Sequence, residues 1–266
     1  MMETRGRKNK IAGKIISSVD QYLAEMRKLP ESSYIYRGQA DEQWHLRSGA
    51  TRRIFRDLDN EDINYDKVAE SVKKLLTRAK NKGFGRIKGK KENDLELLAE
   101  LQHHGAATPL LDFTRNSLVA LWMACSDCID RDGRVFVANI NDSDCFEKIE
   151  YEDLAKEIDE FFGNAKAFFW NPASINERIP AQSSIFIFAE EPYEFATDQL
   201  IIAAKAKKSI LKELEQLFDV TEETIFPDFT GFAQANSADK LLIEYEDFYY
   251  FNKAFELFKM EEKNYL

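Results

Sequence analysis

The order of the apolar segments constrains the fold of this chain more than any other feature. Short runs rich in β-branched and aromatic residues, such as GRVFVANI and SSIFIFA, alternate with longer stretches in which apolar residues recur at helical spacing. The alternation is irregular, so the chain lacks the regular strand–helix repeat of a doubly wound parallel sheet. We therefore predict an α+β fold with antiparallel or mixed sheets.

The patterns also predict where each element lies. Strands are expected at 33–36, 107–114, 133–140, 168–170 and 183–189, the last two flanking a polar connection. Helices are expected at 11–28, 61–81, 94–105, 116–129 and 150–163. The segment 199–220 reads as a strand or linker followed by a helix, and 221–236 as a capped turn into a short helix. Three glycines interrupt the pattern in residues 81–94, which predicts an exposed basic loop there.

The composition indicates a folded globular protein. Of the 266 residues 44% are hydrophobic, including 20 Phe and 10 Tyr, which is far more than a disordered chain carries. No apolar run reaches the roughly 18 residues of a membrane span. The basic N-terminus lacks the apolar segment and the cleavage site of a secretory signal. The three cysteines fit a reducing compartment, so we expect a cytoplasmic location.

The charge is unevenly distributed along the chain. A net charge of −10 argues against a protein that coats nucleic acid nonspecifically. Residues 67–91 nevertheless hold ten basic side chains and one acidic one, whereas the C-terminal third is acidic. This basic stretch is either an ordinary solvated helix face or a surface that meets an anionic cofactor, RNA or the chain's own acidic tail.

Three groups of polar residues lie beside predicted strands. The first group contains Tyr36, Arg37, Gly38 and Gln39; the second contains His103, His104, Thr108, Asp112 and Thr114; the third contains Glu177, Arg178, Gln182 and Ser183. Each group alone has a structural explanation, such as a turn, a satisfied core histidine or a solvated loop. Three groups at strand ends in one domain predict a shared cleft.

The residue spacing does not predict a metal centre. His103 and His104 are adjacent, so they do not point to one face of a helix. Cys125 and Cys128 form a lone CxxC in an apolar helix, without the further ligands that zinc requires. Phosphate-loop, nucleophile-elbow and kinase signatures are absent. We therefore expect no metal site.

Four segments resemble the bacterial FRG domain family, named for a phenylalanine-arginine-glycine motif in which Tyr36 is the aromatic residue here. They read YIYRGQ, LLAELQHHGAATPLLDFTRNSLVALWMAC, NERIPAQSSIFIF and ILKELEQLFDVTEETIFPDFTGFA. The resemblance covers 33–235 and implies a bacterial or phage-encoded intracellular protein. It leaves 1–32 as a helical extension with a basic start and 236–266 as an acidic aromatic tail packed on the domain.

A more distant similarity is to mono-ADP-ribosyltransferases of the arginine-serine-glutamate branch, which transfer ADP-ribose from NAD. It implies a single ADP-ribosyltransferase-like domain with helical additions at both termini. Arg37 between Tyr36 and Gly38 would hold the NAD phosphates, and Thr114 or Thr108 would supply the hydroxyl group. The second polar group, with His103, His104 and Asp112, would complete the NAD site.

The same similarity implies that Glu177 or Gln182 is the working residue. Glu177 precedes an apolar strand, but Ile175 stands where the branch has a second acidic residue, and the Ser-Thr-Ser triplet is absent. Breaking the nicotinamide–ribose bond builds positive charge on the ribose. A carboxylate at about 4 Å would stabilise this charge by about 4 kcal/mol in a medium of intermediate dielectric constant, whereas Gln182 would chiefly position the substrate.

We therefore expect an NAD-consuming ADP-ribosyltransferase-like enzyme, acting as a bacterial or phage-related toxin or an antiviral effector. Its partners would be NAD, a macromolecular acceptor (RNA, DNA or protein) and a neutralising antitoxin, with no membrane involved. Two alternatives stay open. One is a noncatalytic module that binds a nucleotide or phosphate, and the other is a nuclease that uses His103, His104 and Asp112.

Overall fold

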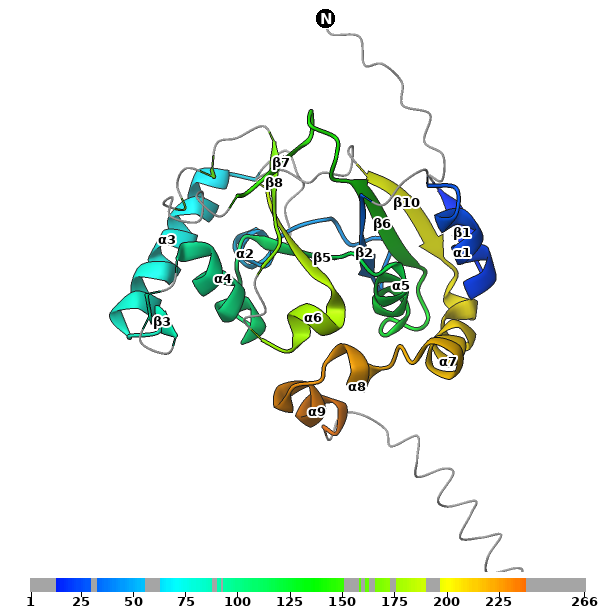
Figure 1. Cartoon of the computed structure of the whole chain (residues 1–266). Helices are drawn as coiled ribbons and strands as arrows, with labels where there is room; N and C mark the ends of the chain where they lie inside the picture. The colour runs from blue at the N-terminus through cyan, green and yellow to red at the C-terminus, as the bar shows by residue number, and fades with distance from the viewer. Residues whose placement is uncertain are drawn as a thin grey trace, which may run out of the picture.

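The computed structural model describes residues 13–29, 33–55, 63–87, 90–91, 93–150, 158, 161–162, 166–172, 176–189 and 197–237 (Figure 1). The predictions for the basic start of the chain, for most of the helix at 150–163 and for all but the first residues of the acidic tail lie outside the described residues.

A mixed eight-stranded sheet forms the centre of the fold, as predicted for an α+β protein. Its strands follow in space as β1 (Lys14–Ile16), β10 (Thr197–Ile202), β6 (Gly133–Asn139), β2 (Tyr34–Gln39), β5 (Leu110–Thr114), β9 (Ser184–Phe188), β8 (Ala167–Trp170) and β7 (Phe146–Lys148). The outermost pairs, β1–β10 and β7–β8, are parallel, and the pairs between them are antiparallel.

Helices flank this sheet. They are α1 (Val19–Met26), α2 (Gly49–Ile54), α3 (Tyr65–Asn81), α4 (Asp94–His103), α5 (Ser117–Cys125), α6 (Arg178–Gln182), α7 (Lys207–Phe218), α8 (Glu222–Ile225) and α9 (Phe229–Ala235), with a 3₁₀ turn at Ala204–Ala206. In Figure 1, α3 and α4 lie at one end of the molecule, α1 and α7 lie at the other, and α8 and α9 lie below α6.

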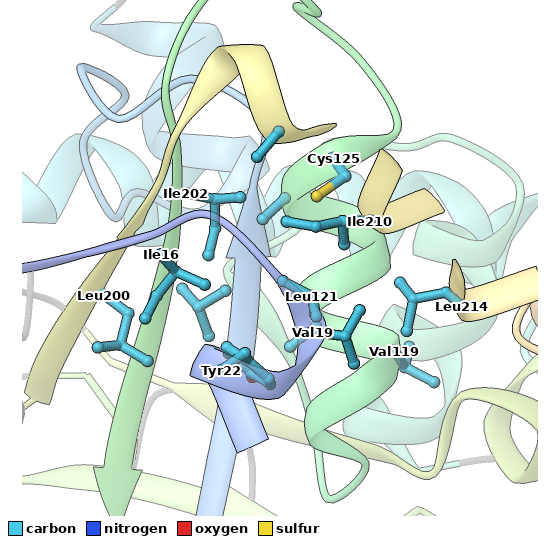
Figure 2. Close-up of a cluster of buried hydrophobic side chains, with 14 of the residues drawn as sticks. Ile16, Val19, Tyr22, Val119, Leu121, Cys125, Leu200, Ile202, Ile210 and Leu214 are labelled. Carbon is cyan, nitrogen blue, oxygen red and sulfur yellow. The ribbon is translucent and has the colours of Figure 1, made fainter. Parts of the chain in front are cut away.

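One hydrophobic cluster joins α1, α5 and α7 to the β1–β10–β6 side of the sheet (Figure 2). Val19, Leu121, Ile210 and Leu214 are fully buried in it. Tyr22 is also fully buried, and its hydroxyl group donates a 2.9 Å hydrogen bond to the carbonyl of Ser117. The buried tyrosine therefore has a partner for its polar end and ties α1 to the start of α5.

Two further clusters use the opposite faces of the remaining strands. On β9, Phe186 and Phe188 face a cluster with α3 and α4, while Ile185 and Ile187 face a cluster that contains Phe136 of β6. This is the two-residue alternation of a strand that is buried on both faces. For this reason the run from Ile185 to Phe188 is apolar without interruption.

Two sequence predictions need correction. Residues 14–16 were expected in a helix but form β1, which pairs in parallel with β10, and the helix begins only after its N-cap, Ser18. In the extended conformation, residues 14–16 pair with the backbone groups at the edge of β10, and a helical turn of the same residues would leave those groups of β10 unpaired. The predicted basic loop contains a short antiparallel ribbon of β3 (Arg86–Ile87) and β4 (Lys90–Lys91).

Candidate functional site

The sheet separates between β2 and β5, and the candidate site lies at this separation. The two strands pair only where Tyr36 lies opposite Thr114, whereas β2 pairs with β6 along its whole length. Beyond that position, Nη1 of Arg37 donates a 2.6 Å hydrogen bond to the backbone carbonyl of Asp112. The guanidinium group thus donates to a backbone carbonyl of β5 that has no backbone partner on β2, because the two strands have separated there.

A small cavity of about 320 Å³ opens beside the separation. Its lining is mostly apolar and includes aromatic and aliphatic side chains from β2, β5, β9 and α5. Its apolar lining includes Tyr36, Phe113, Val119, Met123, Phe186 and Phe226, and its polar lining includes Arg37, Gln102, His103, Asp112, Thr114, Arg178 and Gln182. A hollow of this size with a few polar groups suits one ring system of a small ligand.

The segment that carries α8 and α9 closes one side of the small cavity. Arg178 of α6 forms an ion pair with Asp228, the N-cap of α9, through two hydrogen bonds, of which Nη2 to Oδ1 measures 2.9 Å. Nε2 of Gln182 donates to the carbonyl of Ile225 at 3.1 Å. Phe226 lies under the Arg178 guanidinium group, 5.0 Å from ring centroid to Cζ. These contacts fix α8 and α9 to α6.

A second, larger cavity of about 1010 Å³ lies against the same separation. Its lining contains four arginines, Arg37, Arg47, Arg52 and Arg53, and a single carboxylate, that of Asp112. Trp44 also lines it, with 43% of its surface exposed, and Arg47 lines it although it is only 7% exposed. The rest of the lining consists of small residues of α2 and of the loop after α4, together with Gln102, Leu110 and Leu111. This large cavity is strongly cationic.

Three residues line both cavities: Arg37, Gln102 and Asp112. Nε2 of Gln102 donates a 2.6 Å hydrogen bond to Oδ1 of Asp112, and the hydroxyl group of Thr108 donates to Oε1 of Gln102. Because an ionised carboxylate only accepts hydrogen bonds, the amide nitrogen of Gln102 faces Asp112, and the amide oxygen is left to accept from Thr108. A cation, an amide and a carboxylate thus form the boundary between an apolar hollow and a cationic one.

Loss of water at this boundary shifts the pKa values of its charged groups. It raises the pKa of Asp112, against the opposing effect of the positive charge on Arg37. It lowers the pKa of Arg37, against the attraction of Asp112, and the guanidinium group remains charged at neutral pH. Nε of Arg37 is buried and has no hydrogen-bond partner among the described residues. An anion at this point would relieve part of the desolvation cost.

The structure brings most of the sequence-predicted residues together. Of the ten residues predicted for the NAD site, seven line the small cavity: Tyr36, Arg37, Gly38, His103, Asp112, Thr114 and Gln182; Thr108 lines the large one. Arg178 of the third polar group also lines the small cavity, whereas Gln39 and Ser183 line neither. The hydroxyl group of Thr114 already donates to the carbonyl of Gln182 at 2.5 Å and accepts from the backbone N–H of Asn116 at 2.8 Å. Thr114 therefore joins β5 to the end of α6, which is a structural use of its hydroxyl group.

Two residues predicted for the NAD site lie outside the lining of either cavity. His104 is exposed and contacts Glu100 one helical turn earlier, with Nε2 and Oε1 3.2 Å apart. Glu177 is exposed at the start of α6, while its neighbours Asn176 and Arg178 line the small cavity. The carboxylate that faces both hollows is that of Asp112.

The sequence analysis missed Gln102 and the arginines of the large cavity. On α4, residues 99, 102 and 103 share one face, which lines the small cavity, while 100 and 104 share another. This spacing could have indicated Gln102 in place of His104. Nothing in the local pattern indicates that Arg52 and Arg53 lie near Arg37, because α2 reaches the site only through tertiary packing.

The described part of the chain contains neither a metal-binding cluster nor a membrane-spanning helix. No group of three or more His, Cys, Asp and Glu residues in this part of the chain is arranged to hold a metal ion. None of its helices is both long and apolar enough to cross a membrane.

Comparison with known proteins gives one match, and it covers the boundary between the cavities. No curated protein and no solved structure matches the chain. Residues 32–133, which contain Arg37, Gln102, Asp112 and the large cavity's arginines, match the model of the FRG domain.

Proposed function

We propose that the protein binds NAD at the junction of the two cavities and acts as an ADP-ribosyltransferase-like enzyme. The observation that carries the proposal is the position of Arg37, a desolvated cation between an apolar hollow and a cationic one. The planar guanidinium group matches the oxygen atoms of a phosphate, which a lysine cannot copy. The apolar hollow would take the nicotinamide ring and its ribose, and Arg37 would hold the adjoining phosphates.

The reaction would be a group transfer at ribose C1′. The bond from C1′ to the nicotinamide nitrogen breaks, and its electron pair leaves with nicotinamide. A bond forms from C1′ to an oxygen or nitrogen atom of the acceptor, which releases a proton. Positive charge accumulates on the ribose as the first bond breaks, so a nearby carboxylate lowers the barrier.

We assign that electrostatic role to Asp112. Its side chain lines both hollows, whereas Glu177 lines neither. Gln102 holds the Asp112 carboxylate in position. Gln182 donates to the carbonyl of Ile225 and would position the ligand rather than stabilise its charge. Since the pKa of Asp112 is raised, activity should increase with pH as this carboxylate ionises.

Nicotinamide release from NAD, measured with purified protein, tests the proposal. Arg37→Ala should abolish NAD binding in a calorimetric titration, and Arg37→Lys should restore little of it. Asp112→Asn should lower the rate of release by about 10²–10³-fold, the usual loss for a preorganised electrostatic group. Glu177→Gln is the matched control and should keep the wild-type rate. If wild type releases no nicotinamide and Arg37→Ala binds NAD as wild type does, the proposal fails.

A noncatalytic nucleotide-binding module is the second candidate. One observation favours it: the Asp112 carboxylate already accepts a hydrogen bond from Gln102, and the backbone carbonyl of the same residue accepts one from Arg37. NAD binding that depends on Arg37, without any nicotinamide release, would support this candidate over the enzyme.

A toxin or antiviral role is the biological part of the proposal. An enzyme that modifies a macromolecule of its own cell would stop growth unless a partner neutralised it. Expression of wild type, Arg37→Ala and Glu177→Gln in a bacterial cell tests this role. Growth arrest and NAD loss are expected with wild type and Glu177→Gln only. Equal growth arrest with Arg37→Ala would contradict a role that depends on NAD.

A further inference from the structure

The large cavity has a composition that NAD binding at Arg37 does not require. Besides Arg37 it contains Arg47, Arg52 and Arg53, with Asp112 as the single carboxylate among the lining residues. The protein as a whole carries a net charge of −10, so the local charge of this cavity is opposite in sign to the net charge of the protein. A strongly cationic hollow on an acidic protein indicates a polyanionic ligand.

The second observation is an aromatic platform within the same hollow. Trp44 is 43% exposed, although large apolar side chains elsewhere in the fold are mostly buried. By contrast, Trp170 is 5% exposed and packs at 5.8 Å against Phe186. The indole ring of Trp44 is therefore partly exposed in a hollow that four arginines also line. Bases of single-stranded nucleic acid stack on such rings while arginines contact the phosphates.

The arginines of the large cavity lie next to further basic residues. Arg52 and Arg53 lie on α2, which packs against α3, and exposed residues of α3 and its C-cap include Lys67, Lys73, Lys74, Arg78, Lys80 and Lys82. Cationic side chains thus occupy two adjacent helices rather than one isolated point. An acidic peptide would use the same cations, but a flat ring that could cover Trp44 accompanies the anionic group in every unit only in a nucleic acid. Phosphates joined to bases match both features.

We infer that the large cavity binds a single strand of nucleic acid, with a base stacked on Trp44 and phosphates held by Arg47, Arg52 and Arg53. The inference rests on the proposed function in one respect: it identifies this strand as the acceptor of ADP-ribose. The strand would lie across Arg37 and Asp112 from the apolar hollow. An acceptor atom of the strand would therefore approach C1′ from the side opposite to nicotinamide.

Binding of short oligothymidine and oligouridine strands to the full chain tests the inference. Quenching of tryptophan fluorescence reports stacking on Trp44, and the two strands distinguish DNA from RNA. For about three phosphate contacts, the logarithm of affinity should fall with the logarithm of salt concentration with a slope of about −2. The double variant Arg52→Ala/Arg53→Ala should bind at least about 10-fold more weakly and reduce that slope by about 1.4. Trp44→Ala should weaken binding by about 10-fold and remove the quenching.

The matched control is Arg27→Ala, which removes an exposed arginine just after α1, at the other end of the molecule from α2 (Figure 1). It should bind as wild type does. Absence of strand binding, or equal losses in the control and the double variant, would overturn the inference. Inorganic polyphosphate provides another test. If it binds as tightly as the strand and Trp44→Ala changes neither affinity, the hollow is a simple anion site and the nucleic-acid assignment is wrong.

Nicotinamide release measured on the same preparations separates the two proposals. NAD cleavage without strand binding would contradict the nucleic-acid site but agree with the proposed function. Strand binding that depends on Arg52 and Arg53, without NAD cleavage, would support the nucleic-acid site. It would contradict both the proposed enzyme and the assignment of the strand as the acceptor. Transfer of label from NAD to the strand by wild type, and its loss in the double variant, is the result expected if both are right.

Discussion

Gly38 of β2 lies so close to α5 that a Cβ atom at this position would be 2.0 Å from the carbonyl oxygen of Ala120 and 2.7 Å from the backbone nitrogen of Ala124. Neither backbone atom can move without displacing the helix. The residue after Arg37 is therefore glycine because α5 crosses β2 in direct contact. This contact also places Ala120 and Met123 in the wall of the small cavity.

Gly38→Ala should destabilise the fold by about 1–3 kcal/mol, the usual cost of overpacking a well-packed contact. Urea unfolding measures this loss. Gly85→Ala is the control, because a Cβ atom there would meet nothing closer than the Lys80 side chain, at 3.4 Å. Equal stability of the two variants would show that α5 does not press on β2 as described.

The ion pair between Arg178 and Asp228 should contribute to stability by holding α9 on α6. Both side chains are largely buried, with 17% and 14% of their surface exposed. Asp228→Asn removes the charge but keeps a good N-cap for α9. We expect a loss of about 1–3 kcal/mol in the free energy of unfolding, the range for hydrogen bonds to charged groups. A variant as stable as wild type would contradict a fixed closure of the small cavity.

The same pair predicts a pH dependence. Hydrogen bonds from Arg178 hold the pKa of Asp228 well below its usual range. A carboxylate with a lowered folded-state pKa stabilises the fold above its unfolded-state pKa, near 3.9, and loses that contribution as the pH falls through the folded value. The stability difference between wild type and Asp228→Asn should stay constant between about pH 5 and 8 and shrink below about pH 4. A stability difference that grows as the pH falls would contradict a lowered pKa of Asp228 in the folded protein.

His103 should titrate below the pKa of an unperturbed histidine, 6.5. Partial burial in the small cavity disfavours its charged form, and the positive charge of Arg178 adds to this effect. Because the unfolded chain then binds a proton more readily, this residue should reduce stability as the pH falls below about 6.5. NMR titration, with the signal assigned by its loss in His103→Asn, measures the midpoint. A midpoint above 6.5 would contradict the assigned surroundings.

Lys207 should contribute strongly to stability although it lines neither cavity. It is fully buried, and its ammonium group donates to the carbonyls of Ala40 at 2.6 Å and of Asp127 and Cys128 at 3.0 Å each. Lys207→Met would leave these carbonyls without that donor, at a cost of about 2–4 kcal/mol. Thermal unfolding checks this. The exposed neighbour provides the control, since Lys208→Met should change stability by less than about 0.5 kcal/mol.

Much of the secondary structure could be predicted from local pattern. The β-branched run at 133–140 and the apolar run at 183–189 became β6 and β9, and the apolar stripe at 61–81 became α3. The helix prediction for residues 14–16 was wrong because pairing with the edge of β10, and not the spacing of their own apolar residues, decided their conformation. Local sequence reports backbone preference and burial periodicity, but it does not report which edge lies nearby.

What the sequence by itself determined was an α+β chain with polar groups beside its strands, among them Arg37 and Asp112. Only the tertiary structure decided that β2 and β5 separate after one pair, that Gln102 and not His104 faces the small cavity, and that Glu177 lies outside it. It also brought Arg52 and Arg53 to the same hollow as Arg37. The physical reason is that strand register and helix docking are set by contacts between distant segments, and these contacts decide which side chains meet.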